Sequence, residues 1–403
     1  MTQIMKGIRV LEVAQWWFVP SAGAALCDWG AEVIKIEHPE LGDPQRGLMT
    51  SGMVAGGTSV NFMMEQPNRG KKSVAINLKT PEGVELIYRL AEKCDVFMTS
   101  YLPALRQRLG IDVEHIRARN PNIIYVRGSG QGVRGPDNEK AGYDGTSYWC
   151  RSGMAYALTP RDAESPIGQR PALGDGVGGL TIAGGIAGAL FHRERSGEAT
   201  TVDVSMLATA MWQLAPDIAM APHAETHLSG GRGTPPNPLV NNYRTEDGRW
   251  LQLVMLQSDR DWPDFCRHID RPDLVEDARF ANMALRRENA AECVRTLDEI
   301  FASRPLAEWR KRLATLHGAW TPVQTPREVH DDPQVAANAF LGEVAGADGE
   351  AFKLVANPVQ YDEEPYATLH PAPEHGQNTE EVLLELGLSW QDIAAHKEAK
   401  AIL

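Results

Sequence analysis

Short apolar runs alternate with helix-like segments through the first third of the chain. The runs are short and rich in Val, Ile and Leu, a pattern typical of buried strands. The predicted strands are residues 8–13, 32–36, 96–99 and 123–127. The predicted helices between them are residues 21–29, 80–92 and 112–119. This β-α-β-α order predicts an α/β fold, in which helices cover both faces of a parallel sheet.

The pattern continues with a small-residue helix at 181–195 and a strand at 200–204, and it then loosens. Residues 221–242 are rich in Gly, Pro, Asn and Ser, which is typical of a linker. Beyond it, the turn Glu246-Asp247-Gly248 indicates a hairpin, and helical segments follow as far as residue 316. A later strand at 352–355 and a last helix at 380–386 are also predicted.

These changes in pattern predict more than one folded unit. At 403 residues the chain exceeds the ~250–300 at which one hydrophobic core stops growing. The predicted parts are a large domain beginning with residues 1–220, a linker at 221–242, a small domain at 243–322 and a C-terminal segment at 323–403.

The composition of the chain argues against several classes of protein, among them nucleic-acid-binding and membrane-spanning proteins. The formal net charge of −13 argues against nucleic acid or an anionic membrane surface as the main partner. The five cysteines are far apart and lack the spacing of metal ligands, so we expect reduced thiols and no metal site. The N-terminus lacks an apolar signal core, and the uncharged runs at 47–64 and 176–192 are too rich in glycine and polar residues to span a bilayer. We therefore expect a cytoplasmic location.

Dinucleotide binding is the natural alternative for such an α/β pattern. Glu37 ends the second predicted strand, where a ribose-binding acid would lie. However, the first strand-to-helix turn, residues 14–20, contains no glycine, so a tight pyrophosphate turn cannot form there. The sequence argues against an NAD enzyme.

One carboxylate stands out, because Asp175 lies between Gly174 and Gly176 just before the helix predicted at 181–195. At the start of a helix, free backbone N–H groups and the positive dipole end favour an ionised carboxylate and stabilise an oxyanion. Asp175 is therefore a candidate nucleophile. The other interpretation is an N-cap role for Asp175, a common one for Asp, with Gly176, Gly178 and Gly179 serving only helix packing.

Motifs along nearly the whole chain resemble the class III CoA-transferase family, the group of formyl-CoA transferase, carnitine CoA-transferase and 2-methylacyl-CoA racemase. The matching segments are residues 7–12, 26–37, 42–43 with Arg46, 68–73, 78–83, 143–144, 174–175 and 378–383. The resemblance implies a Rossmann-like parallel-sheet large domain and a smaller α+β domain, with the C-terminal segment returning to the large domain. It also implies an interlocked homodimer, and CoA thioesters as substrates rather than a prosthetic group.

The resemblance implies CoA exchange between an acyl-CoA and a free carboxylic acid. Asp175 matches the family's catalytic aspartate, which forms a mixed anhydride and then an aspartyl-CoA thioester. The family's CoA-contacting positions fall on Trp17, Phe18, His38, Ile76, Asn77, Leu78, Lys79, Ser100, Tyr101, Leu102, Arg108, Ala141, Gly142, Tyr143 and Asp144. Among these, Lys79 and Arg108 are the expected phosphate partners.

Two departures from the family pattern bear on the substrate. The racemase branch carries His where this chain has Tyr143, and a phenol with a pKa near ~10 is a poor base. Trp16 and Trp17 stand where relatives usually have small residues, so we expect one of them to border the acyl pocket, a role in the core being the other interpretation. The alternatives to CoA transfer are a 2-methylacyl-CoA racemase or epimerase and an idle CoA-binding homologue, although an idle fold has no need of Asp175.

Overall fold

The computed structural model describes residues 2–48, 60–160, 163–223, 232–346, 349–366 and 368–403. Contacts within the chain divide it into two compact units. The first unit comprises Met1–Leu158, Pro166–Pro216 and Pro333–Leu403, and the second comprises Thr159–Ser165 and Asp217–Asp332.

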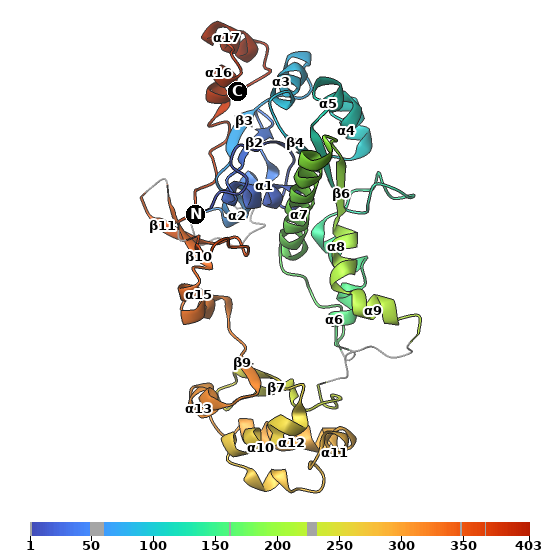
Figure 1. Ribbon diagram of the computed structural model, residues 1–403, viewed down its shortest axis with the longest axis vertical. Helices are drawn as coiled ribbons and strands as arrows, with labels where there is room; N and C mark the ends of the chain where they lie inside the picture. The colour runs from blue at the N-terminus through green and yellow to red at the C-terminus, as the bar shows by residue number, and fades with distance from the viewer. Residues whose placement is uncertain (1, 49–59, 161–162, 224–231, 347–348, 367) are drawn as a thin grey trace. The chain divides into compact units, whose positions relative to one another are not determined.

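A six-stranded parallel sheet forms the centre of the first unit (Figure 1). Its strands are β1 (Arg9–Val13), β2 (Glu32–Glu37), β3 (Lys72–Ala75), β4 (Val96–Thr99), β5 (Ile124–Ser129) and β6 (Thr201–Ser205). Their order across the sheet is β3-β2-β1-β4-β5-β6, with every pairing parallel. The predicted parallel α/β sheet is confirmed. The strand order reverses between β1 and β4, and ligands bind beside such switch points at the carboxyl edge of the sheet.

Several helices of the first unit begin where the sequence offers a capping side chain or a proline. The helices of this unit are α1 (Phe18–Asp28), α2 (Phe62–Asn68), α3 (Pro81–Ala91), α4 (Pro103–Leu109), α5 (Val113–Arg119), the π-helix η2 (Asp144–Cys150), α6 (Met154–Leu158), α7 (Leu173–Ser196) and α8 (Met206–Gln213), with the short η1 (Pro44–Gly47). Those with such a start include α2, α3, α4, α5 and α8. Thr80 caps α3 as predicted, because its hydroxyl accepts a hydrogen bond from the Gly83 N–H at 3.1 Å.

The C-terminal part of the first unit adds a hairpin and two helices. Its elements are α15 (Pro333–Ala337), β10 (Leu341–Ala345), β11 (Ala351–Val355), α16 (Thr379–Glu385) and α17 (Trp390–Glu398). The helix predicted at 380–386 corresponds to α16, but the expectation that it is the last helix was wrong, because α17 follows it.

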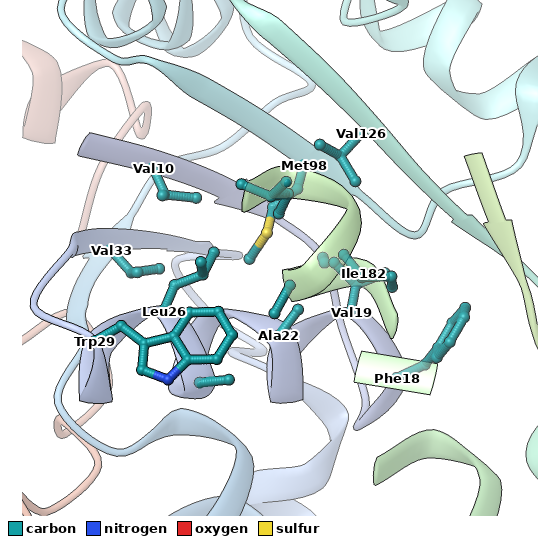
Figure 2. Packing of buried hydrophobic residues seen from close by; sticks show 14 of the residues in the cluster. Val10, Phe18, Val19, Ala22, Leu26, Trp29, Val33, Met98, Val126 and Ile182 are labelled. Atoms are coloured by element: carbon teal, nitrogen blue, oxygen red, sulfur yellow. The ribbon is translucent and has the colours of Figure 1, made fainter. Parts of the chain in front are cut away.

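Two hydrophobic clusters cover the two faces of the sheet, because successive residues of a strand point to opposite sides. On one face, Val10, Val33, Met98 and Val126 pack against α1 and Ile182 of α7, as Figure 2 shows. On the other face, strand residues pack against α3, α5, α16 and α17. Each fully buried Val, Leu or Ile contributes about 1.5–3 kcal/mol, so these clusters fix the carboxyl edge of the sheet.

The second unit is built on a three-stranded antiparallel sheet and several helices. Its strands are β7 (Val240–Arg244), β8 (Trp250–Val254) and β9 (Ala319–Pro322). Helix α9 (Ala215–Met220) begins in the first unit and continues into the second. The other helices are α10 (Ser258–His268), η3 (Pro272–Val275), α11 (Met283–Glu288), α12 (Ala290–Phe301), α13 (Leu306–Arg312), η4 (Leu313–Thr315) and α14 (Pro326–Val329). The predicted hairpin is confirmed, with Gly248 in its turn at a φ of +75°.

The long helix α7 differs most from its prediction. It begins at Leu173 rather than at residue 181, so Asp175 lies inside its first turn. By length and composition it is a candidate to cross a membrane, among the described residues. In the first unit, however, its residues Ile182, Ala183 and Ile186 are fully buried in the core beside α1.

Candidate active site

Asp175 is the third residue of α7, and it does not cap the helix. The N-cap position is Ala172, whose φ of +58° lies in the left-handed region. The free N–H of Gly174 instead donates to both oxygens of Asp144, at 3.1 and 3.2 Å. The capping interpretation of Asp175 was therefore wrong, and the Asp144 side chain supplies the acceptor at this helix end.

Glycine is required at position 174 by the closeness of Asp144. A Cβ placed on Gly174 would overlap the Tyr148 ring and an Asp144 oxygen. Both groups belong to η2, so the missing side chain lets this π-helix approach the start of α7. The result is a pair of neighbouring carboxylates, one hydrogen-bonded to the helix and the other beside it.

The Asp175 side chain is half-buried at the start of α7. Burial raises its pKa to about 7, and the nearby charge of Asp144 raises the pKa further in the same direction. Burial also raises the pKa of Asp144, although hydrogen bonds from Gln169 and from the backbone of Gly174 oppose the change. The helix N–H groups thus serve Asp144, and Asp175 has the raised pKa and weak hydration of a functional carboxylate.

The glycines after Asp175 divide into two roles. A Cβ on Gly178 would overlap the Phe18 ring, and one on Gly179 would overlap Ser21, so both glycines serve close packing of α7 on α1. Among the described residues, none comes within 4 Å of a Cβ placed on Gly176. The position next to Asp175 on the helix therefore faces open space.

The loop between β1 and α1 carries the chain's unusual tryptophans. Trp16 has a φ of +69°, which is costly for any residue but glycine. Its ring packs edge-to-face on Tyr143, with 6.0 Å between centroids, and both rings are partly exposed. Trp17 is half-buried at the N-cap of α1, whereas Phe18 is buried in the core (Figure 2).

We expect Trp16→Gly to be more stable than Trp16→Ala by about 1 kcal/mol, because glycine adopts a positive φ without strain. The order is opposite to that expected at an ordinary loop position, where alanine restricts the unfolded chain. Urea unfolding of the two variants measures the difference. Equal midpoints would show that the Trp16 backbone carries no strain.

A cavity of about 1390 Å³ lies within the first unit at the carboxyl ends of β2 and β3. Seven of the predicted CoA-contacting residues line it: His38, Ile76, Asn77, Leu78, Lys79, Tyr101 and Arg108. The other eight do not line this cavity: Trp17, Phe18, Ser100, Leu102, Ala141, Gly142, Tyr143 and Asp144. Of these, Asp144 lies near Asp175, Tyr143 packs on Trp16, and the Ser100 hydroxyl accepts a hydrogen bond from the Gln15 N–H at 3.2 Å.

The strand-to-helix loop that borders this cavity is held from the far end of the sequence. The Asn77 N–H donates to the Ala401 carbonyl at 2.8 Å, and Ile76 pairs with Ile402. Asn77 in turn accepts a hydrogen bond from the Lys79 N–H at 3.1 Å. Sequence reasoning missed Ala401 and Ile402, because no local pattern links residues so far apart.

Lys79 and Arg108 are suited to bind phosphate. Both side chains border the cavity, and neither forms an ion pair within the part of the chain that the structure describes. His38 accepts hydrogen bonds at Nδ1 from the Glu40 and Leu41 N–H groups, which leaves Nε2 as its donor. Two cations and one ring N–H are thus available to an anionic ligand.

We expect Lys79→Gln and Arg108→Gln each to raise the KM for an acyl-CoA about tenfold while leaving kcat unchanged, because each removes one charged hydrogen bond. Arg327→Gln is the matched control, since Arg327 is an exposed arginine of the second unit that pairs with Asp331. Steady-state kinetics against acyl-CoA concentration give the answer. An unchanged KM in both variants would place the phosphates elsewhere.

The first unit therefore has two features expected of an α/β enzyme: a cavity at the carboxyl edge of its parallel sheet and a carboxylate with a raised pKa at the start of α7. The chain belongs to CoA-transferase family III, whose family model matches residues 5–379. The resemblance drawn from the motifs is confirmed, and the protein is an enzyme of the CoA-transferase class.

Several proteins are similar to this chain over almost its full length. It is 32% identical over 400 residues to (R)-2-hydroxy-4-methylpentanoate CoA-transferase of Clostridioides difficile, covering 99% of both chains. It is 29% identical over 405 residues to cinnamoyl-CoA:phenyllactate CoA-transferase of Clostridium sporogenes, covering 100% of this chain and 98% of the other. The crystal structure of a CAIB/BAIF family protein from Brucella suis superposes with a TM-score of 0.82 and 26% identity, covering 96% and 100% of the two chains.

Proposed function

We propose that this enzyme moves CoA from an acyl-CoA to a free carboxylic acid, with Asp175 as the residue that carries the acyl and CoA groups in turn. The observation that supports the proposal best is the poorly hydrated Asp175 carboxylate beside the open face of Gly176. A carboxylate with little hydration is a stronger nucleophile, and the absence of a side chain at 176 lets a thioester approach it.

In the first half of the reaction, an ionised Asp175 oxygen attacks the thioester carbonyl. The C–S bond breaks, CoA leaves as a thiolate, and the acyl group stays on Asp175 as a mixed anhydride. The thiolate then attacks the Asp175 side-chain carbonyl. This step releases the donor acid as a carboxylate and leaves an aspartyl-CoA thioester.

In the second half, the acceptor carboxylate attacks the aspartyl-CoA thioester and displaces the thiolate, which gives a new mixed anhydride. The thiolate next attacks the acceptor's carbonyl, so the new acyl-CoA leaves and Asp175 is a free carboxylate again. The cycle consumes no proton, and it needs donors for the oxyanion and exclusion of water rather than a general base.

Asp144 has a supporting role in this proposal. Its oxygens are occupied by the Gly174 N–H, so it is a poorer nucleophile than Asp175. Its charge keeps the pKa of Asp175 high, and its hydrogen bond holds the start of α7 in place. We assign it to positioning.

The cavity lined by Lys79 and Arg108 is the proposed site for the nucleotide end of CoA. The remaining candidates, from Trp17 and Ser100 to Ala141 and Tyr143, are proposed to lie along the path of the pantetheine arm toward Asp175. Two relatives are named for acids with a branched or an aromatic side chain. These names support an apolar acyl group for this enzyme as well.

We also propose that the enzyme is cytoplasmic, that it forms a homodimer, and that it works without a prosthetic group. Support for the dimer comes from large apolar side chains exposed on α7 and α8 of the first unit, among them Leu173, Val177, Phe191 and Trp212. Light scattering at working concentration measures the oligomeric state, and a monomeric mass would contradict the dimer.

A hydroxylamine trap tests the covalent step. Protein incubated with an acyl-CoA and then with hydroxylamine is expected to carry a hydroxamate on the peptide that contains Asp175, as mass spectrometry reads out. Protein treated with hydroxylamine alone is the control. Transfer activity without any label on Asp175 would overturn the mechanism.

A further inference from the structure

The backbone of the β1–α1 loop is held at three consecutive residues. The Ala14 carbonyl accepts a hydrogen bond from Lys35 Nζ at 3.0 Å, and the Gln15 N–H donates to the Ser100 hydroxyl at 3.2 Å. The Trp16 N–H donates to Asp43 Oδ1 at 3.3 Å. Strand β2 through Lys35, Ser100 directly after β4, and Asp43 at the start of η1 thus fix the backbone in the left-handed conformation that Trp16 adopts.

A buried ion pair joins two of these contacts. Lys35 Nζ lies 2.8 Å from Asp43 Oδ2, and neither side chain is exposed to solvent. Glu12 contributes a second carboxylate at 3.2 Å from the same Nζ. Because burying such charges costs about as much free energy as their attraction returns, the pair is better explained by the geometry it imposes than by added stability.

The geometry places an aromatic surface next to Asp144, which in turn lies near Asp175, the proposed acyl carrier. The Trp16 ring packs on Tyr143, and their side chains are 37% and 56% exposed. Tyr143 directly precedes Asp144, whose carboxylate binds the Gly174 N–H next to Asp175. The exposed sides of the Trp16 and Tyr143 rings are therefore available to an apolar ligand in this part of the first unit.

The geometry points to Trp16 and Tyr143 as the wall that selects the acyl group, with branched or aromatic acyl chains preferred, and to Asp43 as the positioning residue that holds Trp16 in this wall. The inference rests on the proposed function, since it names the acyl class that Asp175 receives. Apolar pockets discriminate by roughly 10- to 200-fold per methylene group. Loss of either ring should therefore change the order in which the enzyme prefers its acyl-CoA substrates.

The test compares kcat/KM for acetyl-CoA, 4-methylpentanoyl-CoA and 3-phenylpropanoyl-CoA with one acceptor acid. Trp16→Gly removes the ring without backbone strain, and we expect it to lower the preference for the two larger thioesters over acetyl-CoA at least about tenfold. Asp43→Asn keeps the side-chain shape and should lower the same preference less. Trp390→Gly and Asp203→Asn are the controls, since Trp390 is exposed on α17 and Asp203 pairs with Arg127 at the sheet edge.

A double variant separates positioning from general damage. If Asp43 acts through Trp16, then Asp43→Asn has no further effect on substrate preference in the Trp16→Gly background. An equal effect in both backgrounds would overturn the positioning role. If Asp43→Asn fails to fold, Ser100→Ala takes its place in the comparison with the Trp16→Gly background. Ser100→Ala releases only the Gln15 N–H.

The outcomes also separate this inference from the proposed function. No transfer and no labelled Asp175 in the wild-type enzyme with any of the three thioesters would count against the proposed function. Active wild-type enzyme with an unchanged order of substrates in Trp16→Gly would overturn the acyl wall alone.

Discussion

Replacing Asp175 by Ala or Asn is expected to lower CoA transfer at least about 10⁴-fold, the scale at which loss of a covalent nucleophile is felt in other enzymes. The neighbouring carboxylate of Asp144 is not placed to take over, because the Gly174 N–H donates to both of its oxygens. A coupled assay of acyl-CoA formation measures the loss. Turnover within about tenfold of wild type would rule out the covalent mechanism.

The Asp175 variants should lose activity without losing the fold. An ionised carboxylate at position 175 lowers the free energy of unfolding, because it loses hydration in the folded state. Asn is uncharged at every pH and therefore avoids this loss of stability. Since the pKa of Asp175 is raised to about 7, wild-type stability declines as pH rises from about 4 to 7, where the unfolded chain holds an ionised carboxylate and the folded chain does not. Asp175→Asn is therefore expected to be more stable than wild type by about 2 kcal/mol at pH 8.

The matched measurement is urea unfolding at pH 5 and at pH 8. The stability advantage of Asp175→Asn should be present at pH 8 and largely absent at pH 5. Asp203→Asn, which removes a carboxylate paired with Arg127 at the sheet edge, should show no such gain. An Asp175→Asn protein less stable than wild type at both pH values would contradict the poorly hydrated state of this carboxylate.

Short runs of Val, Ile, Leu and Phe were sufficient to predict most of the parallel sheet, because β1, β2, β4 and β5 are largely buried on both faces. β3 (Lys72–Ala75) escaped prediction, since its first half is Lys and Ser and only Val74 and Ala75 are apolar. The early start of α7 could not be read from its glycine-rich first turns, where intrinsic helix propensity is low. Packing of Gly178 and Gly179 on α1 stabilises the helix there, and such packing is a property of the fold.

The candidate site was predictable where its residues are neighbours in sequence. Residues 76–79 follow one strand and therefore reach the same cavity together. The buried pair of Lys35 and Asp43 was missed, although a lysine inside an apolar strand was a signal that it needed a partner. The raised pKa of Asp175 depends on Asp144, which lies 31 positions earlier, and only the fold shows that the two are neighbours.

The reaction itself should depend on pH through the same carboxylate. Asp175 attacks only when ionised, and its pKa is raised to about 7, so kcat/KM should rise about tenfold per pH unit below 7 and level off above it. At pH 5 the enzyme is expected to work at about 1% of its plateau value. A profile measured between pH 5 and 9 with an acyl-CoA of constant charge checks this expectation.

The variant Asp144→Asn identifies the carboxylate behind that profile. Asparagine still offers one oxygen to the Gly174 N–H, but it removes the negative charge that helps to raise the pKa of Asp175. The rise in kcat/KM should therefore move to lower pH. Burial still keeps the pKa of Asp175 above that of an ordinary aspartate. A profile that stays in place, or one that moves to higher pH, would mean that the titrating group is not Asp175 next to Asp144.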